Sequence, residues 1–499
     1  MDALIHLGNG LLIALIPINL LYTFIGVVIG TAIGVLPGLG PPATMALLLP
    51  ITYKIDPTSG VMMLAGIYYG AMYGGSTTSI LLNIPGEAAS VATCLDGYQM
   101  ARQGRAGPAL GAAALGSFFA GTVSLIGLTL VAPPMAEFAL KFGYAEYSSL
   151  VVLGLVMAVY LSEGSVLKGL VMCVLGLLLG TIGLDPVFGV ERFTFGISPL
   201  MDGIDFVVAA MGLFGITEVL CNVDTPEARD VFKTSLKHLL PTRDDWRRMW
   251  APMTRSSIIG FFIGVLPGGG SIISSFIAYA VEKRISKHPE QFGKGAIEGV
   301  IAPESANNAS SSSSFIPLLT LGIPGTATMA MIFVALLIHG IRPGPLMLAE
   351  HPDLFWGLLG SMYIGNVLLL GLNLPLINLW VRLLKVPYQF MAVTVVVICT
   401  IGAYSVKNNA FDVGSMIAFG IIGYFMRKGG FPAAPLLLSM VLGRMLERSV
   451  QQTLSMSGGE LAIFIQRPIS AAMLLISAFI LLTPAVRWLW NRRGMIPSG

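Results

Sequence analysis

The chain has 499 residues, of which 55% are hydrophobic and only 11% are charged, and its mean hydropathy is +0.80. Soluble domains carry about 25% Asp, Glu, Lys and Arg, so this composition excludes an ordinary soluble protein and indicates one that sits in a lipid bilayer. The formal net charge of +3 is too small to indicate nucleic-acid binding, and the four widely spaced cysteines indicate neither a zinc site nor a disulfide framework.

Apolar segments of helical length run along the whole chain. A helix needs about 20 mostly apolar residues to cross the hydrocarbon core, and helices are expected because a lipid-exposed backbone must satisfy its own hydrogen bonds. We therefore expect an all-α, polytopic integral membrane protein of about a dozen helices, multi-pass and without the alternating pattern of a β-barrel. The predicted spans are 11–33, 58–75, 109–132, 147–160, 166–184, 206–221, 256–281, 315–338, 355–381, 389–404, 412–426, 433–446 and 469–488.

One clearly polar stretch, residues 222–255, divides these spans into two series and carries seven Lys and Arg side chains. The positive-inside rule places it in the cytoplasm. We expect a single membrane transport domain over 1–499, with a first repeat half at 11–221 and a second at 256–488.

The apolar element 256–281 is flanked by basic residues on both sides, with Arg255 before it and Lys283 after it. A single crossing would put one of these groups on the wrong side of the membrane. The Gly/Pro-rich stretch 264–270 near its middle favours a re-entrant helical hairpin that returns both ends to the cytoplasm. A plain kinked span is the alternative.

The two halves of the chain repeat the same motifs in the same order, at separations of 230 to 239 residues. Duplicated segments interrupted by Gly and Pro at matching places are typical of a transporter whose binding site lies between two repeats. We predict two internal repeats with broken or re-entrant hairpins, inverted and elevator-like. The matching pairs are Gly34–Gly40 with Gly264–Gly270, Thr77–Ser79 with Ser312–Ser314, Asn83–Gly86 with Gly322–Gly325, and Gly104 with Gly340.

The broken helices would leave free backbone N–H groups with positive dipole character, which can hold an anion. The alternative is that the glycines only allow close helix packing. No arginine lies at an obvious position within the spans, so dipoles and cations would have to balance the anion. The predicted substrate-binding residues are Gly38, Gly40, Ser76, Thr77, Thr78, Asn83, Gly86, Gly268, Gly269, Gly270, Asn307, Asn308, Ser311, Ser312 and Gly325.

The serine run 310–314 joins an apolar run directly, which favours a buried unwound segment over a flexible linker. Carbonyl groups freed in this way could bind a cation, and Glu304 is the best candidate for a coupling-ion or proton site. We expect no catalytic residue and no cofactor other than a coupling cation, Na⁺ with H⁺ as the alternative. A sodium site is predicted near Thr78, Ser79, Ser313, Ser314 and Glu304.

Glycine-rich motifs at 34–41, 69–76 and 83–86, the segment 92–101 with Asp96-Gly97-Tyr98, and the segment 303–308 lie along the chain. Together they resemble the large membrane subunit of the tripartite tricarboxylate transporters, the TctA family, across almost the whole chain. The segment Asp96-Gly97-Tyr98 between two glycine turns is the most specific of them, and Glu87 departs from the small or neutral residue expected after Pro-Gly.

The resemblance implies a bacterial inner-membrane carrier that takes up carboxylates, such as citrate-like tricarboxylates, by symport with an ion gradient. It also implies two partners, a small membrane subunit and a periplasmic substrate-binding protein. Related binding-protein-dependent carriers make an elevator-type movement of the hairpins the expected mechanism. The alternatives are the large subunit of another secondary dicarboxylate carrier and an ion channel. The sequence lacks the Gly-x-Ser-x-Gly and His-Glu-x-x-His motifs of hydrolases, so we expect no enzyme.

Overall fold

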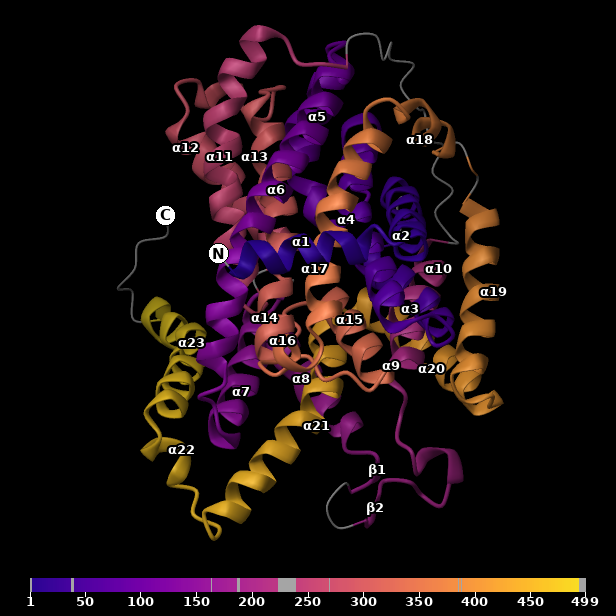
Figure 1. The fold of residues 1–499 in the computed structure, drawn as a ribbon, viewed down its shortest axis with the longest axis vertical. Coiled ribbons are helices and arrows are strands. Elements are labelled where there is room, and N and C mark those ends of the chain that lie inside the picture. The colour runs from indigo at the N-terminus through magenta and orange to yellow at the C-terminus, as the bar shows by residue number, and fades with distance from the viewer. Residues whose placement is uncertain are drawn as a thin grey trace.

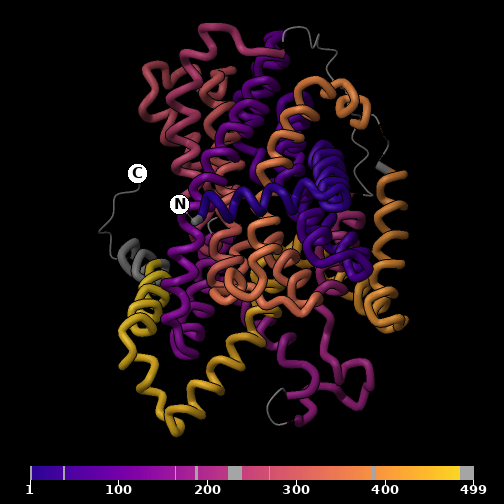
Figure 2. The backbone as a smooth tube through the Cα atoms, in the orientation of Figure 1, coloured from indigo at the N-terminus to yellow at the C-terminus, as the bar shows by residue number. Residues whose placement is uncertain are grey.

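The computed structural model describes residues 2–36, 40–162, 164–185, 189–222, 239–268, 270–384, 386 and 388–492, with the side chains of 2, 388 and 484–492 left aside. The described chain is almost entirely helical (Figures 1 and 2). Its first part contains α1 (Asp2–Ala14), α2 (Pro17–Val35), α3 (Pro41–Thr52), α4 (Pro57–Leu82), η1 (Ala88–Ser90), α5 (Val91–Arg102), α6 (Ala106–Ala139), α7 (Tyr144–Tyr160), α8 (Val166–Gly180), α9 (Phe206–Ala210), η3 (Met211–Ile216) and α10 (Thr217–Asn222).

The second part repeats this helical character. It contains α11 (Arg243–Val265), α12 (Gly270–Ile285), η4 (Pro289–Gln291), α13 (Glu298–Ser313), α14 (Phe315–Leu321), α15 (Ala327–Ile338), α16 (Met347–Glu350), α17 (Pro352–Asn373), α18 (Ile377–Leu383), α19 (Tyr388–Lys407), α20 (Ala410–Lys428), α21 (Ala433–Met456), α22 (Ile463–Gln466) and α23 (Pro468–Arg492). A two-stranded antiparallel hairpin, β1 (Gly183–Leu184) with β2 (Glu191–Arg192), and η2 (Ser198–Leu200) lie between α8 and α9.

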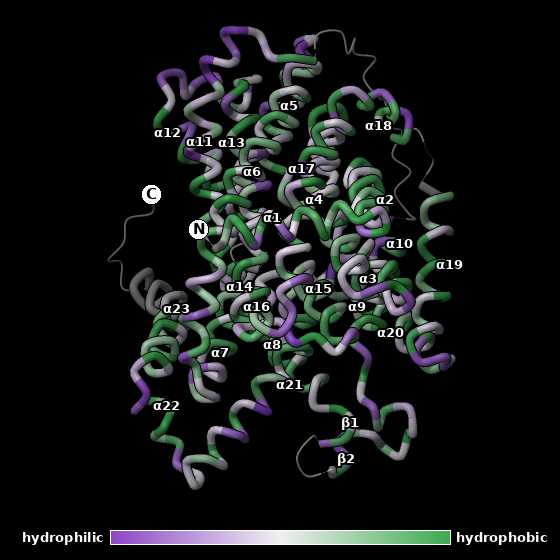
Figure 3. Tube along the Cα trace, in the orientation of Figure 1, coloured by the Kyte–Doolittle hydropathy of each residue, from purple (hydrophilic) through white to green (hydrophobic). Residues whose placement is uncertain are grey.

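Five of the described helices are long and apolar enough to cross a membrane: Pro17–Val35, Ala106–Ala139, Pro352–Asn373, Gln389–Lys407 and Ala410–Lys428. Several shorter apolar helices accompany them. Many large apolar side chains are exposed, including Phe390, Phe425 and Phe479, which a protein surrounded by water would rarely tolerate in such number. Hydrophilic residues gather toward the two ends of the molecule (Figure 3). The fold is therefore that of a multi-pass membrane protein.

Glycines allow two pairs of helices to pack with their backbones in contact. A Cβ added at Gly34 of α2 would lie 2.9 Å from the Cα of Ala71 in α4. A Cβ added at Gly264 of α11 would lie 2.7 Å from the Cα of Ser310 in α13. Both distances are shorter than real Cβ contacts, so only glycine permits these two helix pairs to approach so closely.

The break predicted at 264–270 is confirmed, because α11 ends at Val265 and α12 begins at Gly270. The two helices pack antiparallel, and an ion pair of 2.6 Å between Arg255 and Glu282 joins them near their basic ends. The start of α11 and the end of α12 therefore lie on the same side of the molecule, at the upper left of Figure 1.

The prediction of an unwound segment at Ser310–Ser314 is wrong. Helix α13 continues to Ser313, and Ser314 keeps helical backbone angles before α14. The physical reason is that the hydroxyl of Ser314 donates to the carbonyl of Ser311, and that of Ser313 to the carbonyl of Ser310. Buried serines can satisfy themselves against the helix that carries them. The helical path turns only at Gly322, which has a left-handed φ of +71°.

The polar stretch 222–255 is only partly a loop. Residues 223–238 lie outside the described residues, and α11 already begins at Arg243. The Thr242 hydroxyl and the Asp245 carboxylate form a reciprocal capping box at its start. The first helix of the second half therefore begins 13 residues before the apolar run 256–281 that predicted it, and it covers only the first part of that run.

Candidate functional site

A cavity of about 410 Å³, the central cavity, lies where the turn regions of both halves meet. Residues predicted to bind substrate line it from both halves, namely Gly40 from the first and Gly268, Gly270 and Gly325 from the second. Glycine motifs that are far apart in the sequence thus converge on one space. Gly38 and Gly269 lie outside the described residues.

Four α-helices begin at the wall of this cavity. The lining includes Pro41 at the start of α3, Gly270 at the start of α12, Ala327 at the start of α15 and Ala433 at the start of α21. The first turns of a helix carry unpaired N–H groups and the positive end of the helix dipole. The dipoles of four such ends favour an anion in the space they surround. Pro41 and Pro42 supply no N–H to it, and the lining also contains the carboxylates of Glu87 and of Glu218, which pairs with Arg427.

A backbone hydrogen bond holds two of the turns together. The amide of Gly268 donates to the carbonyl oxygen of Gly325 at 3.0 Å. Thr326, the next residue, caps α15 through its hydroxyl, which accepts from the amide of Met329. The loop before α12 and the loop before α15 therefore form one unit of the cavity wall.

Glu87 places a carboxylate in the wall of the same cavity and is buried. One carboxylate oxygen accepts from the amide of Ala89 at 2.6 Å, and the other accepts from the side-chain amide of Asn307 at 3.1 Å. Glu87 was not among the predicted site residues. Its signal in the sequence was the one feature that departed from expectation, a charge directly after the Pro-Gly turn.

Glu304 lies fully buried among three hydroxyl groups that come from three helices of the first half. Its carboxylate accepts from Ser76 of α4 at 2.5 Å, from Thr93 of α5 at 2.6 Å and from Ser117 of α6 at 3.5 Å. Among the described residues, neither Glu304 nor Glu87 forms an ion pair with Lys, Arg or His. The two halves thus meet over two buried carboxylates neutralised by no cationic side chain of the described chain.

The two asparagines of α13 connect these carboxylates. Asn307 donates to Glu87, whereas the amide of Asn308 donates to the Ser117 hydroxyl at 2.7 Å and to the Glu304 carbonyl. The side-chain oxygen of Asn307 is buried and has no hydrogen-bond partner among the described residues. This oxygen can therefore accept a hydrogen bond or coordinate a cation.

Other predicted residues lie near this network but bond to the backbone. Thr78 donates to the carbonyl of Val35, Ser79 to the Gly75 carbonyl and the Ser90 hydroxyl, and Ser311 to the carbonyl of Asn308. Thr77 and Ser312 are buried.

Two predicted substrate-binding residues shape turns. Asn83 is exposed and ends α4 with a left-handed φ of 58°. Gly86 is buried where an added Cβ would overlap the carbonyl oxygen of Gly34. The structure therefore places both outside the lining of the central cavity.

The described residues include no group of three or more His, Cys, Asp and Glu side chains that could hold a metal ion. A site for Na⁺ would have to use carbonyl, hydroxyl and amide oxygens with at most a few carboxylates.

The comparisons with known proteins identify the family. The profile of the tripartite tricarboxylate transporter TctA family matches residues 20–438. This chain belongs to the TctA family. It is 51% identical over 490 residues, 98% of both chains, to the "Uncharacterized 52.8 kDa protein in TAR-I ttuC' 3'region" of Agrobacterium vitis. It is also 49% identical over 231 residues to the "Uncharacterized protein in TAR-II ttuC' 3'region" of the same organism, 46% of this chain and 96% of that protein. No solved structure matches it.

The predicted family is thus confirmed, and the structure explains the motif that carried it. Asp96 of the TctA chain is buried and accepts hydrogen bonds from the Tyr279 hydroxyl and from the backbone amides of Gly293, Gly295 and Ala296. It ties α5 of the first half to the segment before α13 of the second. TctA is a family of transporters rather than enzymes, so a transport role in the membrane follows.

Proposed function

We propose that this TctA chain is the translocating subunit of a tripartite carrier that takes up carboxylates, citrate-like tricarboxylates or related organic acids, with an ion gradient. The single observation that carries the proposal is the central cavity, at which four helix N-termini converge from both halves. Helix starts aimed at one space are how transporters with broken helices hold an anionic group near the middle of the membrane.

The proposal includes two internal repeats, supported by matching local geometry. Residues Gly104 and Gly340 follow α5 and α15 with φ values of +78° and +74°. In each case the next amide bonds back five residues, Arg105 to Met100 and Ile341 to Leu336. These are the same helix-ending turn at the motif pair that the sequence aligns. The glycine contacts of α2 with α4 and of α11 with α13 repeat in the same way.

We propose Na⁺ as the coupling cation, with H⁺ as the alternative. A multiply charged carboxylate in a medium of low dielectric needs positive charge close to it, and a bound cation could supply it. The buried carboxylates of Glu87 and Glu304 and the unpartnered oxygen of Asn307 are oxygen donors of the kind that Na⁺ takes. The sodium site near Thr78, Ser79, Ser313 and Ser314 belongs to the same hypothesis.

The proposed transporter includes two partner subunits, a small membrane subunit and a periplasmic substrate-binding protein. The family is tripartite, and the large subunit alone contains no soluble binding domain in its described residues. We place the assembly in the bacterial inner membrane, with the α11–α12 hairpin as a re-entrant element that moves in an elevator-type step.

Transport assays test this proposal. The chain is reconstituted with its two partners in liposomes, and uptake of radiolabelled citrate is measured with and without an inward Na⁺ gradient. We expect uptake that requires the binding protein and the gradient, together with exchange of labelled for unlabelled citrate, which a channel does not perform. Absence of uptake for citrate and for other di- and tricarboxylates under both Na⁺ and H⁺ gradients would refute it.

One variant tests the cavity itself. Ala88 is exposed and lines the cavity, so Ala88→Trp should fill it without straining the packed interior and should lower uptake at least tenfold. The matched control is Ala280→Trp, at an exposed position of α12 outside the cavity lining, which should stay within twofold of the parent. Equal uptake by both variants would place the substrate elsewhere.

A further inference from the structure

A second and larger cavity, of about 680 Å³, lies next to the central one. Helices α15 and α21 line both: their first residues, such as Ala327 and Leu438, face the central cavity, and their later residues, such as Phe333 and Met440, face the larger one. The two spaces therefore follow one another along the same pair of helices.

A thin apolar partition separates the two cavities. Ala158, Ala330 and Leu438 form a small buried cluster, and Phe206 packs against it. Ala158 and Leu438 line the central cavity, while Phe206 lines the larger one. This cluster therefore contributes to the walls of both spaces, and none of its side chains carries a polar group.

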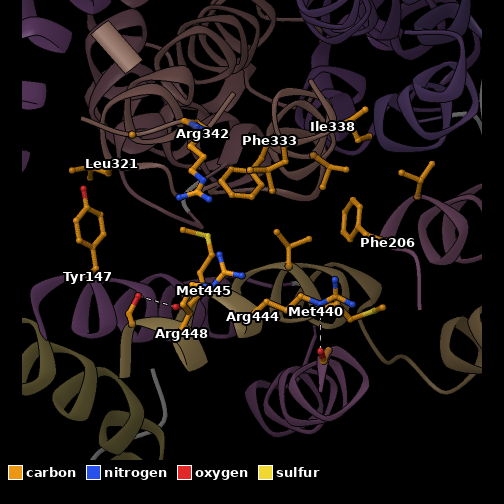
Figure 4. A pocket seen from close by; sticks show the side chains of 18 of the residues that line it. Tyr147, Phe206, Leu321, Phe333, Ile338, Arg342, Met440, Arg444, Met445 and Arg448 are labelled. Carbon is orange, nitrogen blue, oxygen red and sulfur yellow. Dashed lines mark hydrogen bonds between the residues drawn. The ribbon is translucent and has the colours of Figure 1, made fainter. Parts of the chain in front are cut away.

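The larger cavity collects arginines. Arg342, from the segment between α15 and α16, points into it from one wall, and Arg444 and Arg448 lie one helical turn apart on α21 at the opposite wall (Figure 4). All three are exposed, so the cavity reaches the surface. Among the described residues no Asp or Glu lies within ion-pair distance of any of them.

The other charged groups of the lining do not cancel this cluster. Lys407 adds a fourth cation, whereas Asp202, Asp205 and Glu350 supply three carboxylates. The lining therefore has one more positive than negative charge. Asp205 also caps α9 by accepting from the amide of Val207. Arg444 also donates from its Nε to the carbonyl of Gly180, so among the described residues Arg342 and Arg448 are the arginines of this cavity left without a protein acceptor. Guanidinium groups without carboxylate partners are suited to bind a carboxylate through paired hydrogen bonds.

The cavity lies at the end of the molecule away from the basic ends of α11 and α12, since α9, α16 and the later part of α21 are in the lower half of Figure 1. If the basic end faces the cytoplasm, the arginine cavity opens on the outer side. We propose that it is a carboxylate-binding vestibule, which holds the substrate anion by Arg342, Arg444 and Arg448 before the anion passes the Ala330–Leu438 partition into the central cavity. This inference rests on the proposed function for the identity of the anion.

A vestibule of this kind has a kinetic signature. Arginines that capture the anion outside the partition should affect its affinity and leave the later steps unchanged. In proteoliposomes with both partners, Arg342→Gln and Arg448→Gln should each raise the KM for citrate at least tenfold with the maximal rate within twofold. The matched control is Arg247→Gln, an exposed arginine at the other end of the molecule, which should leave the KM unchanged.

Direct labelling separates this inference from the transport proposal. Arg448→Cys is made in a Cys221→Ser background, because the other three cysteines are buried. The chain alone, in phosphatidylcholine liposomes and without a gradient, is treated with anionic 2-sulfonatoethyl methanethiosulfonate. Citrate should slow labelling at least fivefold, and adding Arg342→Gln should abolish the protection. Treatment with 2-aminoethyl methanethiosulfonate, which restores a cation at position 448, should return the KM toward the parent value.

The outcomes are distinct. Protection by citrate without any uptake would uphold the vestibule and refute the transport proposal. Normal uptake with neither protection nor a change in KM would refute the vestibule alone. Protection by phosphatidylglycerol in the absence of citrate, with no added effect of citrate, would overturn it too, because the arginines would then hold a lipid headgroup.

Discussion

The hydroxyl of Ser76 on α4 donates a hydrogen bond of 2.5 Å to the carboxylate of Glu304 on α13, across 228 positions of the chain. Thr93 donates to the other carboxylate oxygen at 2.6 Å. These contacts join α4 and α5 of the first half to α13 of the second at a fully buried carboxylate.

We expect Glu304→Gln to fold but to lose coupled uptake. The amide has nearly the volume of the carboxylate. The hydroxyl that faces its NH₂ group can rotate to accept while the other hydroxyl still donates to the amide oxygen, so the free energy of unfolding should fall by no more than about 2 kcal/mol. The negative charge that would hold a cation is gone, so Na⁺-driven citrate uptake should fall at least tenfold. Initial rates and thermal unfolding measure the two effects.

The control for that experiment is Glu290→Gln, at a carboxylate exposed to solvent in η4. It should leave both measurements unchanged. Coupled uptake by the Glu304→Gln protein that still depends on Na⁺ as in the parent would remove Glu304 from the coupling site.

Substitutions of Asn83 can distinguish a role in shaping the turn after α4 from a role in binding substrate. Its φ of 58° is left-handed, and its side chain is exposed. We expect Asn83→Gly to keep full uptake, because glycine adopts this conformation readily. Asn83→Val should lower the free energy of unfolding by about 1–2 kcal/mol, since a β-branched residue resists it. Stability is followed by thermal unfolding in detergent, and loss of uptake in a stable Asn83→Gly protein would return Asn83 to the substrate site.

How much the sequence could predict depends on the range of the interaction. The breaks at 264–270 and at Gly322 were predictable because Gly and Pro act on their own backbone. The serine run was misread because donation to a carbonyl three residues back satisfies a hydroxyl without unwinding the helix. The role of Glu87 could not be predicted, because it depends on a contact with Asn307 at 220 positions' distance.

Close packing of α2 on α4 gives a prediction about folding. A Cβ at Gly30 would lie 2.8 Å from the Cα of Ile67, so Gly30→Leu must push the helices apart. We expect this variant to lose the monodisperse peak on size-exclusion chromatography, since overpacking typically costs about 1–3 kcal/mol or more. Gly371→Leu is the matched control, because nothing lies within 4 Å of a Cβ there. Identical profiles for both variants would contradict the packing described here.

Asp96 should prove structural. Its carboxylate accepts from the amides of Gly293, Gly295 and Ala296, so Asp96→Asn would turn an NH₂ group toward backbone donors. We expect the free energy of unfolding to fall by about 2–3 kcal/mol, the scale of a buried donor left unpaired. Thermal unfolding of Asp353→Asn, at an exposed aspartate, should match the parent. A stable Asp96→Asn protein that fails only in uptake would argue for a direct role in transport instead.

The basic end of α11, outside its apolar part, gives a prediction about pH. Burial acts to raise the pKa of the Asp245 carboxyl, but hydrogen bonds from Arg105 and Thr242 outweigh it and hold that pKa below its ordinary value of 3.8. A lowered pKa means that the ionised form stabilises the fold above pH 3.8 and that this contribution is lost as the pH falls through the folded value. Asp245→Asn should therefore lower the free energy of unfolding by a constant amount between pH 5 and 7, about 1 kcal/mol for a lost capping contact. The difference from the parent should shrink below about pH 4. Asp244→Asn, which changes a neighbouring carboxylate outside the capping box, serves as the control. A difference between the parent and Asp245→Asn that stays constant down to pH 2.5 would show that the Asp245 charge contributes nothing to the contact with Arg105.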